Sequence, residues 1–404
     1  MTLEENFKLN TREYIFYNDK ILLDERNKIY KKIQLKNYDP KNNESLKNIK
    51  FSDLNKFDYF YKTSKIKPIS RVLEKNSYHL TFINGKCEDF EDKNIEIRNL
   101  LKDDLNIFNS KHNIEDDIVL DFNKLFLNSG IFVNIKENAN INLHITNHLD
   151  KNFTVFQNNL FNFQKNSQVN FHEEFKLEDN SIYNIKNNIK INQKSEIKHN
   201  VFQSFSNKSK LYLTSNTIIE EHSAYTQNIF NFADGFVRNY HYLELNGENA
   251  SATLKGCFFL KDQNICSNKT YISHNAENCQ SNQTFKGILN DESKANYYSN
   301  TIVSSNAQKT EGYQLSKGIL LTDNCSFFSK PELRIYTDDV KCSHGSTIGP
   351  VDESALYYLR SRGINKNQAM KMIISSFIKD DLNDLDEKNY NEISKKISKY
   401  LKKI

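Results

Sequence analysis

The sequence predicts a mostly β chain: a parallel solenoid of two stacked sheets, with a mixed region before it and a helical region after it. Three observations predict this fold. From about residue 120 to residue 340, apolar and polar residues alternate in short runs, as in strands with one buried face. Small residues recur in this part at a fixed spacing, which is typical of solenoids. After it, apolar residues are instead spaced as on helices.

Composition and charge exclude several classes of protein. The 404 residues include 55 Lys and Arg against 51 Asp and Glu, a net charge of +4. The two signs are interleaved, so no basic stripe indicates nucleic acid binding. No run reaches the roughly 18 apolar residues of a membrane-spanning helix, and the polar start is unlike a signal peptide. We therefore expect a cytoplasmic protein with its six Cys reduced. None of them is in a C-x-x-C pair, so spacing gives no support to a zinc site.

The first region, residues 1–115, combines helical and irregular patterns. Leu22 to Ile33 has the pattern of a highly charged helix. His79 to Gly85 has that of a short strand ending at a turn glycine.

The solenoid is predicted over residues 116–350. Within it, serines that each follow a polar residue recur every 14 residues, and a strand-like segment follows most of them. We expect each serine to occupy a turn that admits only a small side chain, before a strand with one face inward. Two such units would complete a coil and give each sheet one strand. Chance spacing of a common residue is the alternative. The five serines are Ser167, Ser181, Ser195, Ser209 and Ser223, with Ala139, Ala250, Cys279 and Ser293 loosely in phase.

The last region, residues 351–404, is predicted to be helical. Asp352 to Ser361 forms one helix, with Gly363 just beyond its end. Asn365 can cap a second helix, and the acidic segment Asp380 to Glu387 is predicted as a turn. The second helix carries one apolar stripe, and a third has apolar residues on one face and lysines on the others. These helices either cap the solenoid or dock a partner. The stripe comprises Met370, Ile373, Ile374, Phe377 and Ile378, and the face comprises Ile393, Ile397, Tyr400, Leu401 and Ile404.

Metal chemistry is possible at Cys342 and His344. The two residues are two positions apart, so in a strand they face the same side. A thiolate and an imidazole can share a borderline metal, with further ligands from elsewhere or from another chain. The alternative is a buried cysteine beside a hydrogen-bonded histidine.

Other chemical signals are weak. The sequence has neither a P-loop nor a G-x-S-x-G motif. The clusters His172 to Glu174 and Glu220 to His222 are predicted to be solvated surface. The cysteines of the solenoid are predicted to be small buried apolar residues: Cys257, Cys266, Cys279 and Cys325.

The C-terminal half resembles a known family. Ser329 to Leu333, Asp338 to Gly345 and Glu353 to Ile364 resemble the C-terminal signature of the SufB/SufD family of the SUF iron–sulfur cluster assembly system. The run D-D-V-K-C-S-H-G favours the SufD branch over SufB. Weaker matches include Ala307 to Thr310 and Phe82 to Gly85.

The resemblance implies a right-handed parallel β-helix flanked by helical domains. It implies a non-catalytic scaffold subunit that forms a heterodimer with SufB through the solenoid end and binds the SufC ATPase through its C-terminal helices. A nascent iron–sulfur cluster would form at the SufB–SufD interface, with His344 as ligand or helper and Cys342 beside it. No tightly bound cofactor is expected in the isolated chain, which could also form homodimers. The residues expected to contact a partner are Met370, Ile373, Phe377, Leu356 and Leu359.

Two other functions remain as alternatives. A carbohydrate-active β-helix enzyme would need an acid/base pair in a groove along the solenoid, and the sequence shows no convincing pair. A purely structural solenoid would not need the C-S-H-G segment or the paired C-terminal helices.

Overall fold

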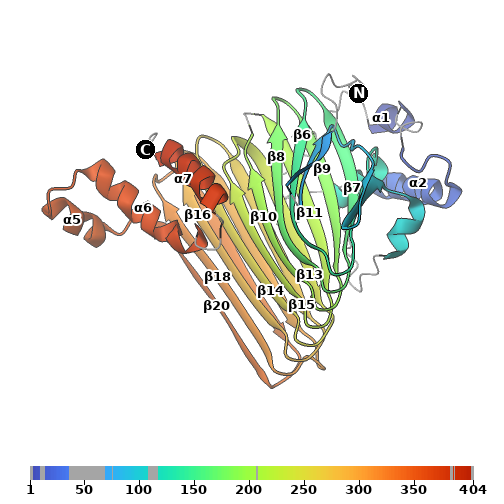
Figure 1. Ribbon diagram of the computed structural model, residues 1–404. Coiled ribbons are helices and arrows are strands. Elements are labelled where there is room, and N and C mark those ends of the chain that lie inside the picture. The colour runs from blue at the N-terminus through green and yellow to red at the C-terminus, as the bar shows by residue number, and fades with distance from the viewer. Residues whose placement is uncertain are drawn as a thin grey trace.

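The fold is a long two-sheet solenoid with helices at both ends (Figure 1). The computed structural model describes residues 3–9, 14–35, 69–74, 76–107, 117–205, 208–382, 385 and 387–401. Ten strands form each sheet, and most neighbouring strands are parallel. The predicted mostly β solenoid with flanking helices is therefore confirmed.

From β5 onward, successive strands alternate between the two sheets. Of the strands that the structure describes, only those at the N-terminal end, β1 against β2 and β3–β4–β5, pair antiparallel. The first sheet contains, in spatial order, β1 (Ile69–Glu74), β2 (Ser77–Ile83), β6 (Asn140–Leu149), β8 (Gln168–Leu177), β10 (Glu196–Gln203), β12 (Ala224–Asn231), β14 (Ser251–Leu260), β16 (Gln280–Leu289), β18 (Thr310–Leu320) and β20 (Val340–Pro350). The second contains β19 (Ser326–Ile335), β17 (Lys294–Val303), β15 (Ile265–His274), β13 (Gly235–Leu245), β11 (Ser209–Ile219), β9 (Ile182–Ile191), β7 (Thr154–Phe163), β5 (Ile131–Ile135), β4 (Ile95–Asn99) and β3 (Phe90–Glu91).

The five phased serines stand at equivalent strand entries, as predicted. Ser167, Ser195 and Ser223 come immediately before strands of the first sheet, and Ser181 and Ser209 enter strands of the second. All five are buried. Hydroxyls one coil apart meet: Ser167 Oγ lies 3.2 Å from Ser195 Oγ, and Ser181 Oγ lies 3.4 Å from Ser209 Oγ. A larger side chain would have no room in this stack.

The residue before each serine has a left-handed backbone. Asn166, Asn180, Lys194, Lys208 and His222 all have φ between 56° and 72°. This conformation turns the chain sharply from one sheet to the other, and asparagine tolerates it better than most residues with a side chain. The phase therefore marks a two-residue corner, and only its second residue was evident from the spacing.

The space between the sheets has an apolar core with a polar row inside it. Asn147 Nδ2 donates a hydrogen bond to Glu173 Oε1 over 2.9 Å, and Glu173 Oε2 lies 3.3 Å from His199 Nε2. His199 Nδ1 is in turn 2.9 Å from the Tyr225 hydroxyl. Glu173 is only 1% exposed. The prediction of a solvated surface was wrong for this residue, because it faces inward between two buried phenylalanines.

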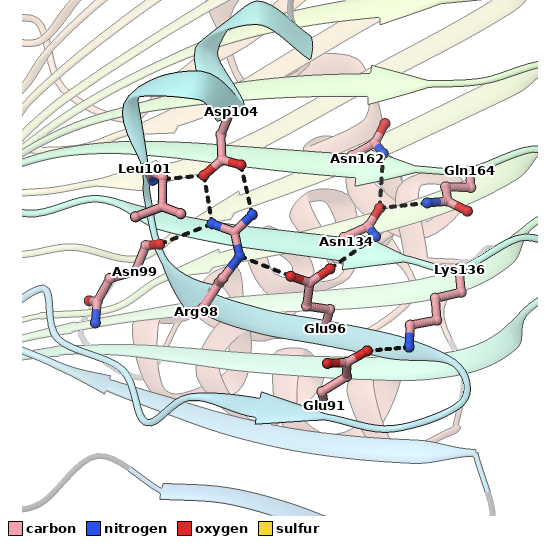
Figure 2. Close-up of polar contacts among 10 residues, drawn as sticks. All are labelled: Glu91, Glu96, Arg98, Asn99, Leu101, Asp104, Asn134, Lys136, Asn162 and Gln164. Atoms are coloured by element: carbon pink, nitrogen blue, oxygen red, sulfur yellow. Dashed lines mark hydrogen bonds and ion pairs between the residues drawn. The ribbon is translucent and has the colours of Figure 1, made fainter.

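A polar network secures the N-terminal end of the second sheet (Figure 2). Arg98 on β4 makes a bidentate pair with Asp104, at 2.6 and 2.7 Å, and its Nε donates to Glu96 over 2.9 Å. Asp104 belongs to the 3-10 helix η2 (Lys102–Ile107). Glu96 accepts from Asn134 of β5, which accepts from Asn162 of β7. The network ties η2 to three successive strands.

Helices cover the outer face of each sheet. On the second sheet, α4 (Ile118–Leu125) packs with α2 (Lys20–Leu35), while α1 (Leu3–Leu9) contributes Phe7. On the first sheet, α6 (Lys366–Leu382) and α7 (Glu387–Leu401) bury an apolar cluster that includes Phe230, Phe259 and Tyr400. No helix within these described ranges is long and apolar enough to cross a membrane.

The C-terminal helices begin as predicted, but one extends further. Asp352 caps α5 (Glu353–Ser361), Gly363 has φ +87° after it, and Asn365 Oδ1 accepts from the Gln368 amide to cap α6. The acidic segment is not wholly a turn, because α6 continues to Leu382. Buried Asp381 pairs there with Lys286 Nζ of β16 at 2.9 Å. Ile404 of the predicted apolar face lies outside the described residues.

Candidate functional site

Cys342 and His344 lie on the strand that ends the first sheet. Among the described strands, this one, β20, pairs only with β18, and none of them covers its other edge at the end of the solenoid (Figure 1). β19 occupies the same terminal position in the second sheet. The last coil therefore presents two strand edges and the inner faces of both strands, with no further coil to cover them.

His344 continues a polar row from the interior. The register aligns Gln283 of β16 with Gln314 of β18 and with His344 of β20. Gln314 is buried between the sheets, so its in-register neighbour His344 also projects from the inner face. His344 is nevertheless exposed, because the solenoid stops there. It stands at the end of the solenoid and outside the core, where we expected it.

Gln314 is fixed behind His344 by three hydrogen bonds. Its Oε1 accepts from Ser299 Oγ over 2.8 Å, and its Nε2 donates to Thr301 Oγ1 over 2.6 Å. Nε2 also donates to the backbone oxygen of Glu332 on β19, over 3.1 Å. Gln314 thus links both sheets at the last covered coil and provides a rigid base for the terminal one.

Cys342 is half-buried beside a glycine. It pairs in register with Gly312, and its Sγ lies 3.3 Å from where a side-chain Cβ on Gly312 would stand. The missing side chain leaves room for the thiol on the same face as His344. Burial raises the pKa of the Cys342 thiol, which keeps it protonated in the isolated chain.

The described part of the chain offers no third metal ligand beside Cys342 and His344. The group of three that it does contain is distant in the sequence and holds no thiol: His148 Nε2 lies 3.1 Å from Asp150 Oδ1 and 3.7 Å from Glu178 Oε1. At least half of the ligands to a metal at the terminal coil would have to come from another molecule.

The residues predicted to bind a partner lie on α5 and α6 and remain a prediction in that role. Met370, Ile373 and Phe377 of α6 are half-buried and pack against the cluster under α6 and α7. Leu356 and Leu359 of α5 are also half-buried. α5 has no buried residue and extends away from the solenoid (Figure 1).

Two features of this region were not predicted from the sequence. Tyr357 and Tyr358 of α5 are 77% and 58% exposed and dominate the apolar surface of that helix. No role was predicted for Gln314, although alternation places it on the same face as buried Gly312 and Ser316. A polar residue at an inward position of a strand was the signal that could have identified it.

The four solenoid cysteines, in contrast, are buried as predicted, and all six cysteines are free.

Comparison with known proteins gives the family. Residues 144–377 match the family model described as SUF system FeS cluster assembly, SufBD core domain. Iron-sulfur cluster assembly protein SufD of Escherichia coli is 31% identical over 176 residues, 43% of this chain and 41% of that protein. Iron-sulfur cluster assembly protein SufD of Plasmodium falciparum is 25% identical over 164 residues, 40% of this chain and 11% of that protein. Protein ABCI7, chloroplastic, of Arabidopsis thaliana is 45% identical over 58 residues, 14% of this chain and 12% of that protein.

The chain therefore spans less than half the length of each of these relatives. The family model, in contrast, covers more than half of the chain and includes most of the solenoid, the Cys342–His344 segment and α5. The chain belongs to the SufBD family of the SUF iron–sulfur cluster assembly system.

Proposed function

We propose that this chain is a SufD-like, non-catalytic scaffold subunit that pairs with a SufB-type partner through the terminal coil. The observation that carries the proposal is the placement of His344 and Cys342 on the inner face of an uncovered edge strand. A second solenoid end placed there could pair with the open strand edges and enclose both side chains.

A nascent cluster is the substrate of this site, since iron–sulfur clusters are held mainly by thiolates, with histidine as a known substitute. His344 would supply an imidazole nitrogen, and Cys342 a thiol that becomes a ligand only after losing its proton. The partner would supply the remaining ligands, because the described residues hold no third one here.

The C-terminal helices are the proposed docking site for the SufC ATPase. α5 exposes Tyr357 and Tyr358 beyond the solenoid, and exposed apolar surface of this kind marks protein interfaces. Met370, Ile373, Phe377, Leu356 and Leu359 would contribute their accessible edges. ATP hydrolysis would then belong to the partner.

Replacement of His344 by Ala tests the cluster role. We expect purified His344→Ala complex to fold and assemble but to contain several-fold less iron and sulfide after anaerobic reconstitution, because the imidazole nitrogen is lost. His148→Ala is the matched control, since it removes the histidine of the other group of potential ligands. Parental cluster content in the His344→Ala complex, with or without an effect of His148→Ala, would refute the cluster role.

A further inference from the structure

The helices α5 and α6 carry positive charge without acidic residues between the charges. From Ser354 to Lys379 the sequence contains five Lys and Arg and no Asp or Glu, although the whole chain has 55 of the former and 51 of the latter. This part of the chain extends away from the solenoid at α5 (Figure 1). It is therefore a local concentration of positive charge on a chain that is nearly neutral. The five residues are Arg360, Arg362, Lys366, Lys371 and Lys379.

Three of these cations are exposed together where α5 ends and α6 begins: Arg360, Arg362 and Lys366. None of the three forms an ion pair with any described residue. Arg362 instead stacks over a ring of its own helix, with its guanidinium carbon 5.4 Å from the centre of the Tyr358 ring. Exposed cations need no partner to be stable, but a cluster of one sign attracts and orients a surface of the opposite sign.

The middle of α5 is apolar on every side. Leu356, Tyr357, Tyr358 and Leu359 are four consecutive residues, and one helical turn takes 3.6 residues, so their side chains surround the helix. No residue of α5 is buried, and the two tyrosines are 77% and 58% exposed. A helix that is apolar all round is normally enclosed by protein. A nucleic acid backbone could pair with the cations but would not cover this turn, so a protein partner is favoured.

The length of α5 gives a second reason to expect a partner that encloses it. The helix has nine residues, and its start is capped by Asp352, whose Oδ1 accepts from the amides of Ser354 and Ala355 over 2.9 and 3.2 Å. Isolated helices shorter than about 12–15 residues are marginal in water, and most helices in proteins are stabilised by packing of an apolar face. α5 has such apolar residues, but the chain itself does not bury them.

We propose that α5 and the start of α6 dock into an apolar groove of the ATPase partner, and that carboxylates at the rim of this groove pair with Arg360 and Arg362. Tyr357 and Tyr358 would be the anchors inside the groove, because aromatic side chains in desolvated pockets contribute most to binding. This inference rests on the proposed docking of the ATPase and adds the chemistry of the surface that the ATPase presents.

Calorimetric titration of the full chain with the SufC ATPase at two salt concentrations tests the proposal. Charges act over about 10 Å at 0.1 M salt and over about 3 Å at 1 M. We expect the affinity to fall by about tenfold or more between these two concentrations, because the ion pairs at the rim are accessible to salt. A docking surface without ion pairs would keep its affinity under the same change.

Variants separate the cations from the anchors. The double variant Arg360→Gln with Arg362→Gln should weaken binding severalfold at low salt and match the parent at high salt. The matched control is Lys395→Gln with Lys399→Gln, which removes two exposed charges from α7 and should leave binding unchanged. Tyr357→Ala should weaken binding by about tenfold at both salt concentrations, since it removes an apolar contact.

Hydrogen exchange gives a readout that does not depend on affinity. The backbone amides of α5 should exchange more slowly in the complex, because the partner would then stabilise a helix that the chain leaves uncovered. Unchanged exchange in a saturated complex would overturn the proposal.

The outcomes also distinguish this proposal from the docking itself. No binding of SufC to the parent chain at either salt concentration would refute both. Binding that is insensitive to salt and to the arginine variants, or that falls equally with the α7 control, would overturn the carboxylate rim and leave the docking intact. A single-stranded DNA oligonucleotide should show no saturable binding to the full chain at about 0.15 M salt. Tighter binding of this oligonucleotide than of SufC, with the same dependence on Arg360 and Arg362, would assign the cations to nucleic acid and overturn the proposal.

Discussion

At the scale of single residues, the solenoid depends on a corner of two neighbours, one left-handed and one small. The small residue is fixed by packing, since the hydroxyls of Ser167 and Ser195 are in contact across one coil. Cys279 takes the same position later in the chain and donates its thiol proton to the Gly247 backbone oxygen over 3.3 Å. The left-handed residue is fixed by the backbone alone, so its side chain can vary and the sequence shows no constant residue there.

Lys194 provides a test of the corner, because it has a left-handed backbone, with a φ of 59°, although it is neither glycine nor asparagine. Lys194→Gly should leave stability unchanged or raise it slightly, since glycine adopts this conformation without steric cost. Lys194→Val should lower the free energy of unfolding by about 1–2 kcal/mol. Urea denaturation followed by circular dichroism measures both changes. Equal stabilities of the two variants would contradict a steric role for the corner, and Gln193→Val, one residue earlier, is the control.

Buried histidines make stability depend on pH. Burial lowers the pKa of His241 from 6.5 to about 3 and that of His274 to about 4. Both are neutral when folded at pH 6, whereas unfolded histidines take up protons below 6.5. Their contribution to the free energy of unfolding is therefore complete above pH 6.5. It is lost as the pH falls towards 4 for His274 and towards 3 for His241. Each adds a slope of about 1.4 kcal/mol per pH unit.

Replacement of His241 by Gln should flatten this profile. Gln can keep a hydrogen bond to Ser215 Oγ, which lies 2.7 Å from His241 Nδ1, but it does not titrate. Chemical denaturation between pH 6.5 and pH 4 should show a smaller loss of stability for His241→Gln than for the parent. Parallel profiles would mean that His241 is not the titrating group.

At the scale of elements, local patterns predicted the helices and most of their caps but not how they attach. The apolar stripe of α6 was evident from its spacing, and Ile374 and Ile378 are indeed buried. The ion pair of Asp381 with Lys286 was not, because a strand far earlier in the chain supplies the lysine. For the same reason, alternation identified the strands but not the polar row between the sheets, whose members are partners only after coiling.

The attachment of α6 can be tested by a double-mutant cycle on Lys286 and Asp381. Lys286 Nζ also donates to the Phe377 backbone oxygen over 2.8 Å, and burial raises the pKa of Asp381 despite the nearby lysine. Asp381→Leu alone should destabilise the fold by about 3–5 kcal/mol, because it leaves a buried charge without a partner. Lys286→Met with Asp381→Leu should recover most of that loss. Additive effects in urea denaturation would show that the two residues act independently.

At the scale of the whole molecule, the number of coils decides where interior becomes surface. The serine phase predicted two alternating sheets, but it fades after Ser223 because the coil length then varies: Ser209 of β11 pairs with Gly235 of β13, a shorter coil, and Lys294 of β17 pairs with Ser326 of β19, a longer one. The sequence placed Cys342 and His344 on one face of one strand. It could not show that this face is an interior one left open, since that depends on β20 having no following coil.

Ile335 tests whether this open end pairs with a partner. It lies at the end of β19, in register with buried Val303 but itself 40% exposed, and Tyr336 beside it is 64% exposed. An aspartate there would place an unpaired charge in the proposed interface, at a cost of several kcal/mol. Light scattering after size exclusion should therefore show loss of the heterodimer with a SufB-type partner for Ile335→Asp, while circular dichroism stays that of the parent. Ile21→Asp is the matched control, because Ile21 is 64% exposed on α2 at the opposite end. A heterodimer that survives Ile335→Asp, or is lost equally with Ile21→Asp, would place the partner elsewhere on the molecule.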